Sequence, residues 1–368
     1  MFGTSGIRGL YGKEVTESLA IKVANAFSDR DIAIGRDIRR TGVPLSMAAA
    51  SGALAAGKDV IRLGIVPTPT VALATKKHSC NGIMITASHN PGEYNGMKLI
   101  SETKEIDKAY EKKVSERCTQ ELRLSEWDKV GKTSDDNEII KNHIDLVLEQ
   151  VDTTLIKSRK PKVVVDCNGA GAVITPMLMR DLGCEVSVMN DSLEGFSRPS
   201  EPNEKNLQGL IERMRSEKAD MGIAHDGDAD RTVIVDDLGN VLPLDVQLAM
   251  MIEHELERSD NKKIISTMEA SLAIREVVQN AGGSIDITPV GSTYVSEELE
   301  KLGALFGGEP CGEYIYEKGV HVPDAMLASA KFVELFCMKG RFSEQREKYH
   351  QYSMAREKLQ AANKYDAV

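Results

Sequence analysis

The chain has 368 residues, a formal net charge of -10, 41% hydrophobic residues and 28% charged residues. This length favours two to three domains, and the acidic balance without a basic block excludes a nucleic-acid partner. No apolar run is long enough for a membrane helix, and the N-terminus lacks the basic and apolar regions of a secretory signal. The six cysteines show no C-x-x-C spacing. We therefore expect reduced thiols and a cytoplasmic protein without membrane contact.

An internal repeat organises the chain. Residues 32–63, 163–188 and 264–287 each give an apolar strand, a helix, a glycine and a second apolar strand. The glycine just past each helix fits a left-handed C-terminal cap, and the strand-helix-strand crossover implies parallel strands. We predict an α/β fold in which three repeated domains with mixed sheets surround a central cleft.

A further apolar strand follows in each unit and ends in polar residues. In the first unit, Ile83–Ile85 leads into Thr86–Pro91, where asparagine and proline supply turn chemistry. Ser88 would lie at the strand tip beside His89, where a serine can carry a phosphoryl or acyl group. The alternative is a surface turn without chemistry.

In the second unit the equivalent strand ends at a run of alternating carboxylates. Asp226, Asp228 and Asp230 would place three hard oxygen ligands on one side of an extended loop, which suits Mg²⁺ or Ca²⁺ rather than zinc. An EF-hand is excluded because Arg231 stands where that loop requires glycine. We expect Mg²⁺, and a solvated acidic turn is the alternative.

The same residues allow a second hypothesis. Asp228–Thr232 fits the short D-x-D-x-T pattern of aspartate-nucleophile phosphatases, in which Asp228 would be phosphorylated. Such a motif normally lies near the beginning of a catalytic domain, whereas this one interrupts a repeat.

The third unit has an apolar strand, Ala304–Phe306, followed by a glycine-rich loop around Glu309. Glu309 could accept hydrogen bonds from sugar hydroxyls, and the alternative is a structural glutamate in a loop. Ligands of α/β sheets bind beyond the carboxyl ends of strands. Three equivalent strands would therefore direct three polar loops at one substrate.

Four motifs together resemble the α-D-phosphohexomutase superfamily, in the order that the family has them. They are Phe2–Gly9, Thr86–Pro91, Asp226–Arg231 and Gly307–Gly312. The resemblance implies a magnesium-dependent transfer of phosphate between C6 and C1 of a hexose. It also implies a phosphorylated serine and a bisphosphate sugar that reorients without leaving.

The resemblance assigns roles to individual residues. Ser88, with His89 beside it, matches the phosphoserine, and its phosphate would complete a metal site. The matching metal ligands are Asp226, Asp228 and Asp230. Residues matched to the reacting oxygen and to the phosphoryl charge are Arg8, Lys98 and Arg231. Residues matched to sugar binding and to sensing of the sugar's orientation are Glu309, Cys311, Gly312, Thr288 and Gly291.

Within the superfamily the sequence most resembles archaeal-type phosphoglucosamine mutases, at Met1–Gly6, Val165–Gly171, Glu201–Glu204 and Ala224–Asp226. That branch interconverts glucosamine-6-phosphate and glucosamine-1-phosphate with a hexose bisphosphate as activator, as a monomer or homodimer. Cys311 and Glu313 depart from the serine and histidine of the commoner sugar loop. Phosphomannomutase or phosphoglucomutase activity therefore stays open, as do the phosphatase above and a catalytically impaired sugar-phosphate binding protein.

The predicted domains are residues 1–143 with the serine loop, 144–241 with the metal loop and 242–345 with the sugar loop. Residues 346–368 would form a helical tail or linker to an absent fourth domain, and the sequence predicts a polar helical stretch after Gly340 through Ala362. The family's fourth domain carries an R-x-S-G-T-E-P loop that grips the non-reacting phosphate. That motif is not in the sequence, so we expect this domain to be missing here, either because the sequence is a fragment of a longer chain or because the protein has impaired turnover.

Overall fold

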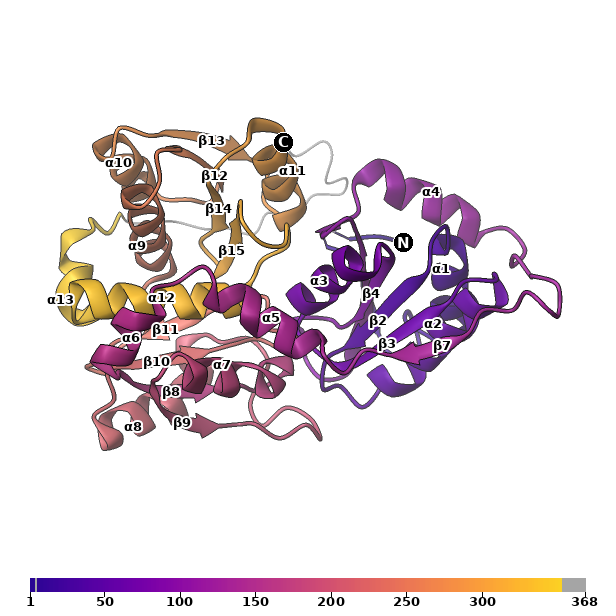
Figure 1. Ribbon diagram of the computed structural model, residues 1–368, viewed down its shortest axis with the longest axis horizontal. Helices are drawn as coiled ribbons and strands as arrows, with labels where there is room; N and C mark the ends of the chain where they lie inside the picture. Colours follow the sequence, from indigo (N-terminus) through magenta and orange to yellow (C-terminus); the bar gives the residue numbers. More distant parts are fainter. Residues whose placement is uncertain (4, 353–368) are drawn as a thin grey trace.

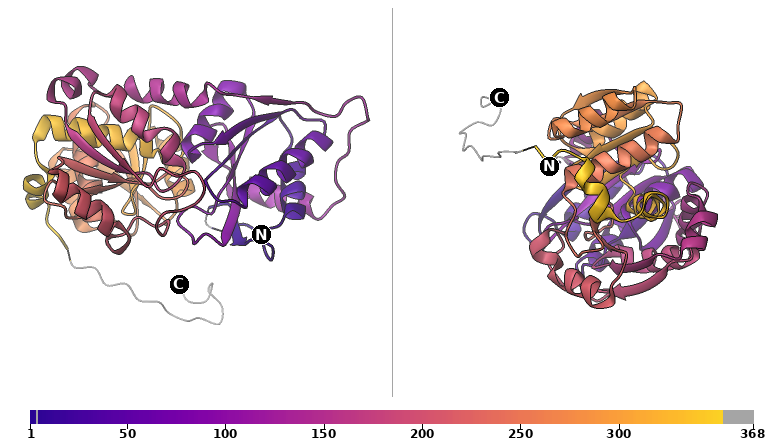
Figure 2. Two further views of the ribbon diagram at one scale, coloured as in Figure 1. Left: turned by 90° about the horizontal axis from the view of Figure 1, so that it is seen from below. Right: turned by 90° about the vertical axis from the view of Figure 1, so that its left-hand side faces the viewer.

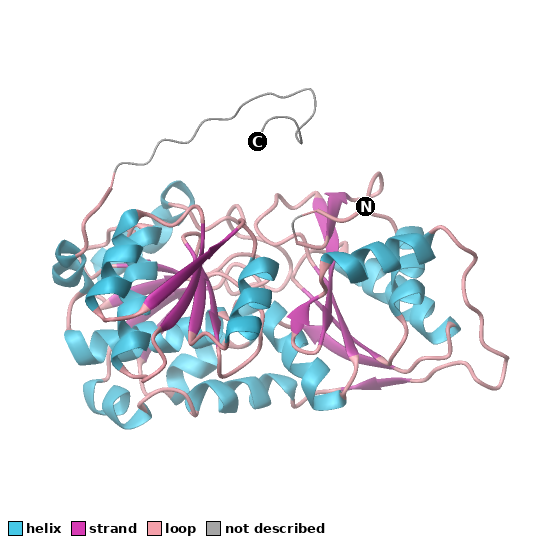
Figure 3. Ribbon diagram, turned by 90° about the horizontal axis from the view of Figure 1, so that it is seen from above, coloured by secondary structure: helices cyan, strands magenta, loops and turns pink. Residues whose placement is uncertain are grey.

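The computed structural model describes residues 1–3 and 5–352. Three α/β units follow one another along the chain, and the N-terminal unit lies to one side of the other two (Figure 1, Figure 2). Helices surround the strands in each (Figure 3). Among the described residues, no helix is long and apolar enough to cross a membrane.

The first unit has a seven-stranded sheet of order β1-β5-β4-β2-β3-β7, with β6 beside β5. Its strands are β1 (Ile7–Leu10), β2 (Ile32–Arg36), β3 (Val60–Ile65), β4 (Asn81–Ile85), β5 (Tyr94–Ser101), β6 (Lys104–Glu105) and β7 (Thr133–Asp135). Its helices are α1 (Glu17–Phe27), α2 (Gly42–Ala55), α3 (Thr68–His78) and α4 (Lys108–Cys118).

Alternating side chains of the central strands give this sheet two apolar faces. On β2, Ile32 and Ile34 pack in the cluster that contains α1 and α2, whereas Ala33 packs in the cluster that contains α3. Successive side chains of a strand point to opposite faces, so an unbroken apolar strand must be covered on both sides. The apolar run predicted as a strand is therefore the centre of a three-layered unit.

The second and third units each have a four-stranded sheet, of order β11-β10-β8-β9 and β13-β12-β14-β15. Elements of the second are β8 (Lys162–Asp166), η1 (Ala170–Val173), α7 (Thr175–Asp181), β9 (Glu185–Met189), η2 (Glu204–Leu207), α8 (Gln208–Glu217), β10 (Met221–Ala224) and β11 (Val233–Val235). Elements of the third are α9 (Leu244–Glu257), β12 (Lys263–Thr267), α10 (Leu272–Asn280), β13 (Ser284–Thr288), α11 (Ser292–Leu302), β14 (Phe306–Glu309), β15 (Glu313–Tyr316) and α12 (Ala325–Lys339).

The predicted repeat is confirmed at the level of strand pairing. In each unit a central strand pairs in parallel with its crossover partner on one side and with a third strand on the other. The third strand, β4, β10 or β14, then pairs antiparallel with the strand that follows it. The three polar loops thus occupy the equivalent hairpin in each of the three sheets. Gly57, Gly183 and Gly282 have the expected positive φ.

The second and third units share one hydrophobic core. Helix α12, which follows the third sheet, packs in the same cluster as the sheet and helices of the second unit. Two helices precede that unit, α5 (Ile139–Leu148) and α6 (Thr153–Arg159). Buried His143 on α5 bridges Thr70 Oγ1 at 2.8 Å and Asp324 Oδ2, at the start of α12, at 3.1 Å. The predicted boundary between residues 143 and 144 thus falls within α5, and the domain limits stay a prediction.

Two expectations about local structure were wrong. Strand β14 continues to Glu309 instead of ending at Phe306, because Phe306–Glu309 pairs fully with Glu313–Tyr316 across a tight turn. After Gly340 the chain forms only α13 (Phe342–Gln345) and η3 (Arg346–Lys348) before Tyr349, instead of one long helix. The predicted helical residues 353–362 lie outside the described residues.

Candidate active site

Ser88 lies in the hairpin loop after β4 and is 1% exposed. Its φ of 49° is in the left-handed region, which costs a non-glycine residue about 1–2 kcal/mol, and its amide donates to Thr86 Oγ1 at 2.8 Å. Ser88 Oγ donates to Asp226 Oδ2 at 2.8 Å, and His89 Nδ1 lies 3.2 Å from the same Oγ. The serine hydroxyl is therefore directed at the aspartate loop of the second unit.

Arg39 fixes the backbone of this loop. Its guanidinium donates to the carbonyl oxygens of Ser88 and Asn90 at 2.8 Å and to that of Pro91 at 2.7 Å. The same side chain forms a buried ion pair with Asp37 at 3.0 Å. One buried arginine thus satisfies carbonyls that a tight turn leaves without partners, and it holds the strained serine in place.

We expect Arg39→Ala to lower the free energy of unfolding by about 3–5 kcal/mol, because it leaves Asp37 as an unpaired buried charge. Chemical denaturation followed by circular dichroism measures the change. The neighbouring Arg40 is the matched control, since its exposed side chain donates, among the residues that the structure describes, only to the Glu194 carbonyl at 3.3 Å. Arg40→Ala should stay within about 0.5 kcal/mol of the unsubstituted protein. Equal losses in both variants would contradict the role given to Arg39.

The three aspartates of the second loop form a compact cluster. Asp226, Asp228 and Asp230 each offer a carboxylate oxygen within 4.8 Å of the others, and all three are buried. Within the described residues, Oδ1 of each has no hydrogen-bond partner. An unpaired buried carboxylate oxygen is costly, and three that converge fit a cation of the hard, oxygen-preferring kind. The donor set therefore fits Mg²⁺.

The pKa values of the three carboxyl groups in this cluster are shifted in different directions. Burial and Asp228 raise the pKa of Asp226 to about 6, and the same two causes raise the pKa of Asp230. Burial also acts on Asp228, but Lys98 and the Thr68 hydroxyl hold its pKa below the usual range. Like charges at this distance disfavour joint ionisation, so a further cation is needed for all three carboxylates to be charged together.

Two basic residues reach the cluster from the first sheet. Lys98 on β5 lies 2.9 Å from Asp228 Oδ2 and 2.5 Å from Asp230 Oδ2, and these carboxylates raise its pKa against the effect of burial. Arg8 on β1 is paired in register with Gly96 on β5, and its Nη2 donates to Ser5 Oγ at 3.3 Å. The Arg8 Nε is buried without a partner among the described residues. Both cations therefore lie beside the sheet edge at which Ser88 is held.

The third loop meets the second through an ion pair. Arg231 donates twice to Glu313 Oε1, at 3.0 and 2.8 Å, and the Thr232 amide donates to the Gly312 carbonyl at 3.0 Å. Glu309 Oε2 accepts from the Gly291 amide at 2.9 Å, which links the sugar loop to the start of α11. The hairpin that carries Cys311 is thereby attached to the metal loop.

Comparison with known proteins agrees with this arrangement. Three consecutive segments match the three α/β/α domains described as phosphoglucomutase/phosphomannomutase domains I, II and III, over residues 1–124, 141–239 and 244–352. The chain belongs to the phosphoglucomutase/phosphomannomutase family. Each of the three matched segments contains one of the polar hairpin loops described above.

Curated members of this family resemble the chain along most of its length. It is 39% identical to a probable phosphoglucosamine mutase of Methanococcoides burtonii over 91% of this chain and 77% of that one. It is 38% identical to a phosphoglucosamine mutase of Methanococcus vannielii over 98% of this chain and 81% of that one. A putative phosphomannomutase structure from Thermus thermophilus shares the fold, with a TM-score of 0.87 and 24% identity over 95% of this chain and 82% of that one.

The structure groups most of the residues that the sequence singled out. Ser88, His89, Lys98 and Arg231 are connected to the aspartates by direct contacts or by charge coupling, and Glu309, Gly291, Cys311 and Gly312 lie on the adjoining loops. The Thr288 hydroxyl is not directed at this group of residues. It donates to the carbonyl of the next residue, Pro289, at 2.9 Å.

Sequence reasoning missed the residues that support the serine loop. Asp37 and Arg39 follow the first strand of the repeat, so their place at the same sheet edge was available as a signal. Ser200, whose Oγ donates to the Ser88 carbonyl at 3.0 Å, gave no such signal, because it lies in an irregular segment 112 residues away. Only the structure explains the glycine at position 227, because a Cβ there would lie 2.8 Å from the Ser88 carbonyl oxygen.

Proposed function

We propose that the chain is a phosphoglucosamine mutase that interconverts glucosamine-6-phosphate and glucosamine-1-phosphate. The observation that supports the proposal is the 2.8 Å contact between Ser88 Oγ and Asp226 Oδ2, which joins a serine hydroxyl to a cluster of three carboxylates. The curated relatives of that name, at 38–39% identity, support the same substrate class.

Each residue of the site then has a role. A phosphoryl group on Ser88 passes to the free hydroxyl of a bound monophosphate, which gives a bisphosphate and restores the serine hydroxyl. After the sugar reorients, Ser88 takes up the other phosphoryl group and the isomeric monophosphate leaves. Mg²⁺, held by Asp226, Asp228 and Asp230, would supply charge neutralisation at the phosphoryl oxygens when bound.

The basic residues complete this charge balance. Arg8, Lys98 and Arg231 offer fixed positive charge around Ser88, and Lys98 stays protonated because, against the effect of burial, its carboxylate neighbours raise its pKa. His89 is neutral at pH 7, because burial and then Arg231 and Arg8 lower its pKa to about 4. A neutral imidazole 3.2 Å from Ser88 Oγ can accept the Ser88 hydroxyl proton as Ser88 takes up a phosphoryl group, and it can return that proton to Ser88 Oγ when the phosphoryl group passes to the sugar.

The test is the conversion of glucosamine-6-phosphate to glucosamine-1-phosphate with Mg²⁺ and glucosamine-1,6-bisphosphate, followed by phosphorus NMR. Mannose-6-phosphate and glucose-6-phosphate run in parallel as competing substrates. Preferred turnover of the hexosamine phosphate is expected. Preference for either hexose phosphate would replace the proposal with phosphomannomutase or phosphoglucomutase activity, and labelling of Ser88 without turnover would favour a sugar-phosphate binding role.

The sugar loop suggests how an amino sugar would be selected. Glu309 and Glu313 lie together, and burial with the nearby Glu313 raises the pKa of Glu309 to about 8, so Glu309 is protonated at neutral pH. Arg231 and Lys98 keep Glu313 ionised despite its burial by lowering its pKa. One carboxylate and one carboxylic acid thus adjoin, and the carboxylate can accept from a substrate ammonium group.

We expect Glu313→Gln to lower the preference for glucosamine-6-phosphate over glucose-6-phosphate, measured as the ratio of kcat/KM values, by about tenfold. One charge-assisted hydrogen bond contributes about 1.5–3 kcal/mol, of which the amide retains a part. Glu317→Gln is the matched control, because Glu317 is exposed beyond the end of β15. An unchanged ratio in Glu313→Gln would exclude Glu313 from recognition of the amino group.

A further inference from the structure

The two oxygens of each aspartate in the cluster have different surroundings. Oδ2 of Asp226 accepts from Ser88 Oγ at 2.8 Å, and Oδ2 of Asp230 accepts from Lys98 Nζ at 2.5 Å. Oδ2 of Asp228 lies 2.9 Å from the same Nζ. Oδ1 of all three aspartates is buried without a hydrogen-bond partner among the described residues. One oxygen of each carboxylate is thus held by the protein, and the other is left for a cation.

Thr68 adds a second contact to one of the held oxygens. Its hydroxyl donates to Asp228 Oδ2 at 2.5 Å, and its amide donates to the Asp228 carbonyl at 3.0 Å. Both residues are completely buried. Asp228 Oδ2 therefore contacts a threonine hydroxyl as well as the Lys98 ammonium group. A carboxylate with two donors on one oxygen cannot turn about its last side-chain bond without losing a charge-assisted contact.

The first turn of helix α3 explains why Thr68 lies at this place. Thr68 is the first residue of α3, and Pro67 before it has an extended backbone. Amides in the first turn of a helix have no partner within the helix, so the Thr68 amide is available to an outside acceptor. The N-terminus is also the positive end of the helix dipole, which favours the Asp228 carboxylate beside it.

The same turn of α3 is fixed to the rest of the molecule two residues later. Thr70 Oγ1 lies 2.8 Å from His143 Nδ1 on α5, and His143 Nε2 lies 3.1 Å from Asp324 Oδ2. The other oxygen of Asp324 accepts from the first amides of α12. Thr68 is therefore part of a turn that contacts the aspartate loop on one side and α5 on the other.

We propose that Thr68 is a positioning residue for the cation, because it holds Asp228 through Oδ2 and so leaves Oδ1 free to bind the ion. The inference rests on the proposed Mg²⁺ site and extends it to a residue with no part in the phosphoryl chemistry. Ser88 and Lys98, which hold the other Oδ2 atoms, carry a reacting or a charged group, whereas Thr68 offers only a neutral donor. All three anchoring side chains belong to the first unit and all three aspartates to the second. The cation site is thus complete only where the two units meet.

Isothermal titration of the full chain with Mg²⁺ tests this role without reference to turnover. Thr68→Val keeps the shape of the side chain and removes the hydroxyl, so it should raise the Mg²⁺ dissociation constant about 10–100-fold, the usual effect of losing a group that orients a metal ligand. Thr68→Ser keeps the donor, and its dissociation constant should stay within about threefold of the unsubstituted value. Undiminished affinity in Thr68→Val, or an equal loss in Thr68→Ser, would overturn the proposal.

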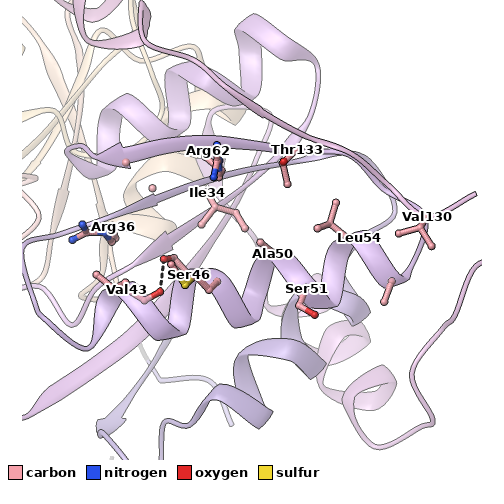
Figure 4. A pocket seen from close by; sticks show the side chains of 14 residues that line it. Ile34, Arg36, Val43, Ser46, Ala50, Ser51, Leu54, Arg62, Val130 and Thr133 are labelled. Carbon is pink, nitrogen blue, oxygen red and sulfur yellow. Dashed lines mark hydrogen bonds between the residues drawn. The ribbon is translucent and has the colours of Figure 1, made fainter.

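Thr133→Val is the matched control, because it makes the same substitution at an exposed threonine of β7. Thr133 lines a cavity of about 670 Å³ beside α2, and none of the three aspartates lines that cavity (Figure 4). Its Mg²⁺ affinity should equal that of the unsubstituted chain. A loss in Thr133→Val as large as that in Thr68→Val would mean that the effect is not specific to Asp228, and would count against the proposal.

Melting temperatures separate positioning from a purely structural role. A structural loss would lower the melting temperature of metal-free Thr68→Val but would leave the further rise produced by Mg²⁺ unchanged. The proposal instead predicts a smaller Mg²⁺-induced rise in Thr68→Val at equal Mg²⁺ concentration, restored in Thr68→Ser, because a ligand stabilises a protein according to its concentration relative to the dissociation constant. A rise of unsubstituted size in Thr68→Val would refute the positioning role.

The titration also distinguishes this inference from the proposed function. If the unsubstituted chain binds no Mg²⁺, the proposed metal site is wrong and the role of Thr68 is refuted with it. If the unsubstituted chain and Thr68→Val bind Mg²⁺ equally well, only the role of Thr68 is refuted, and the proposed function stands.

Discussion

Replacement of Ser88 by alanine should abolish covalent phosphorylation and lower mutase turnover by about 10⁴-fold or more, the scale on which loss of a covalent nucleophile acts in other enzymes. The expected loss is large because Ser88 Oγ is directed at Asp226 and, in the proposed mechanism, carries the phosphoryl group between the two half-reactions. Alanine keeps the Cβ and accepts the left-handed backbone at about the same cost as serine, so the loop should keep its shape.

The measurement is intact mass and peptide mapping after incubation with glucosamine-1,6-bisphosphate and Mg²⁺. The unsubstituted chain should gain one phosphoryl group on the peptide that contains Ser88, and that group should survive hydroxylamine. Ser46→Ala, on the outer side of α2, is the matched control and should label normally. A label that remains in Ser88→Ala and is released by hydroxylamine would identify Asp228 as the nucleophile and support the phosphatase hypothesis.

Asp228→Asn should weaken Mg²⁺ binding and lower Mg²⁺-dependent turnover by at least about 100-fold, while the chain stays folded. Asp228 is the carboxylate whose pKa Lys98 and Thr68 hold low against the effect of burial, so it offers a full negative charge to a cation at neutral pH. Asparagine has nearly the same shape but removes one of the three anionic ligands that we propose for the cation.

Isothermal titration with Mg²⁺ measures binding without reference to activity. Asp181→Asn is the matched control, because Asp181 is an exposed residue at the end of α7 and takes no part in the cluster. Undiminished Mg²⁺ affinity in Asp228→Asn would show that the cation binds elsewhere. Lost affinity together with a lowered melting temperature in the absence of metal would instead point to a folding defect.

The domain architecture could be predicted from the sequence because its signals are local. The order of strand, helix, glycine and strand recurs within about thirty residues, and each step depends on neighbouring residues only. The alternating aspartates and the Ser88 turn are local in the same sense. Their chemistry follows from residue type and spacing, so both candidate loops could be identified before any fold was known.

The tertiary structure alone decided which side chain each charged residue of the site contacts. Lys98 reaches Asp230 across 132 positions, Arg231 reaches Glu313 across 82, and Arg39 reaches the Ser88 carbonyl across 49. No short pattern encodes such pairs, because they depend on how strands and sheets that are distant in the sequence come together. The extent of β14 was misjudged for a related reason: Gly307 and Gly308 have low strand propensity, but pairing with β15 outweighs it. The sequence thus determined the strands, helices and polar loops of each unit. Tertiary packing decided which charged side chains of these loops contact one another.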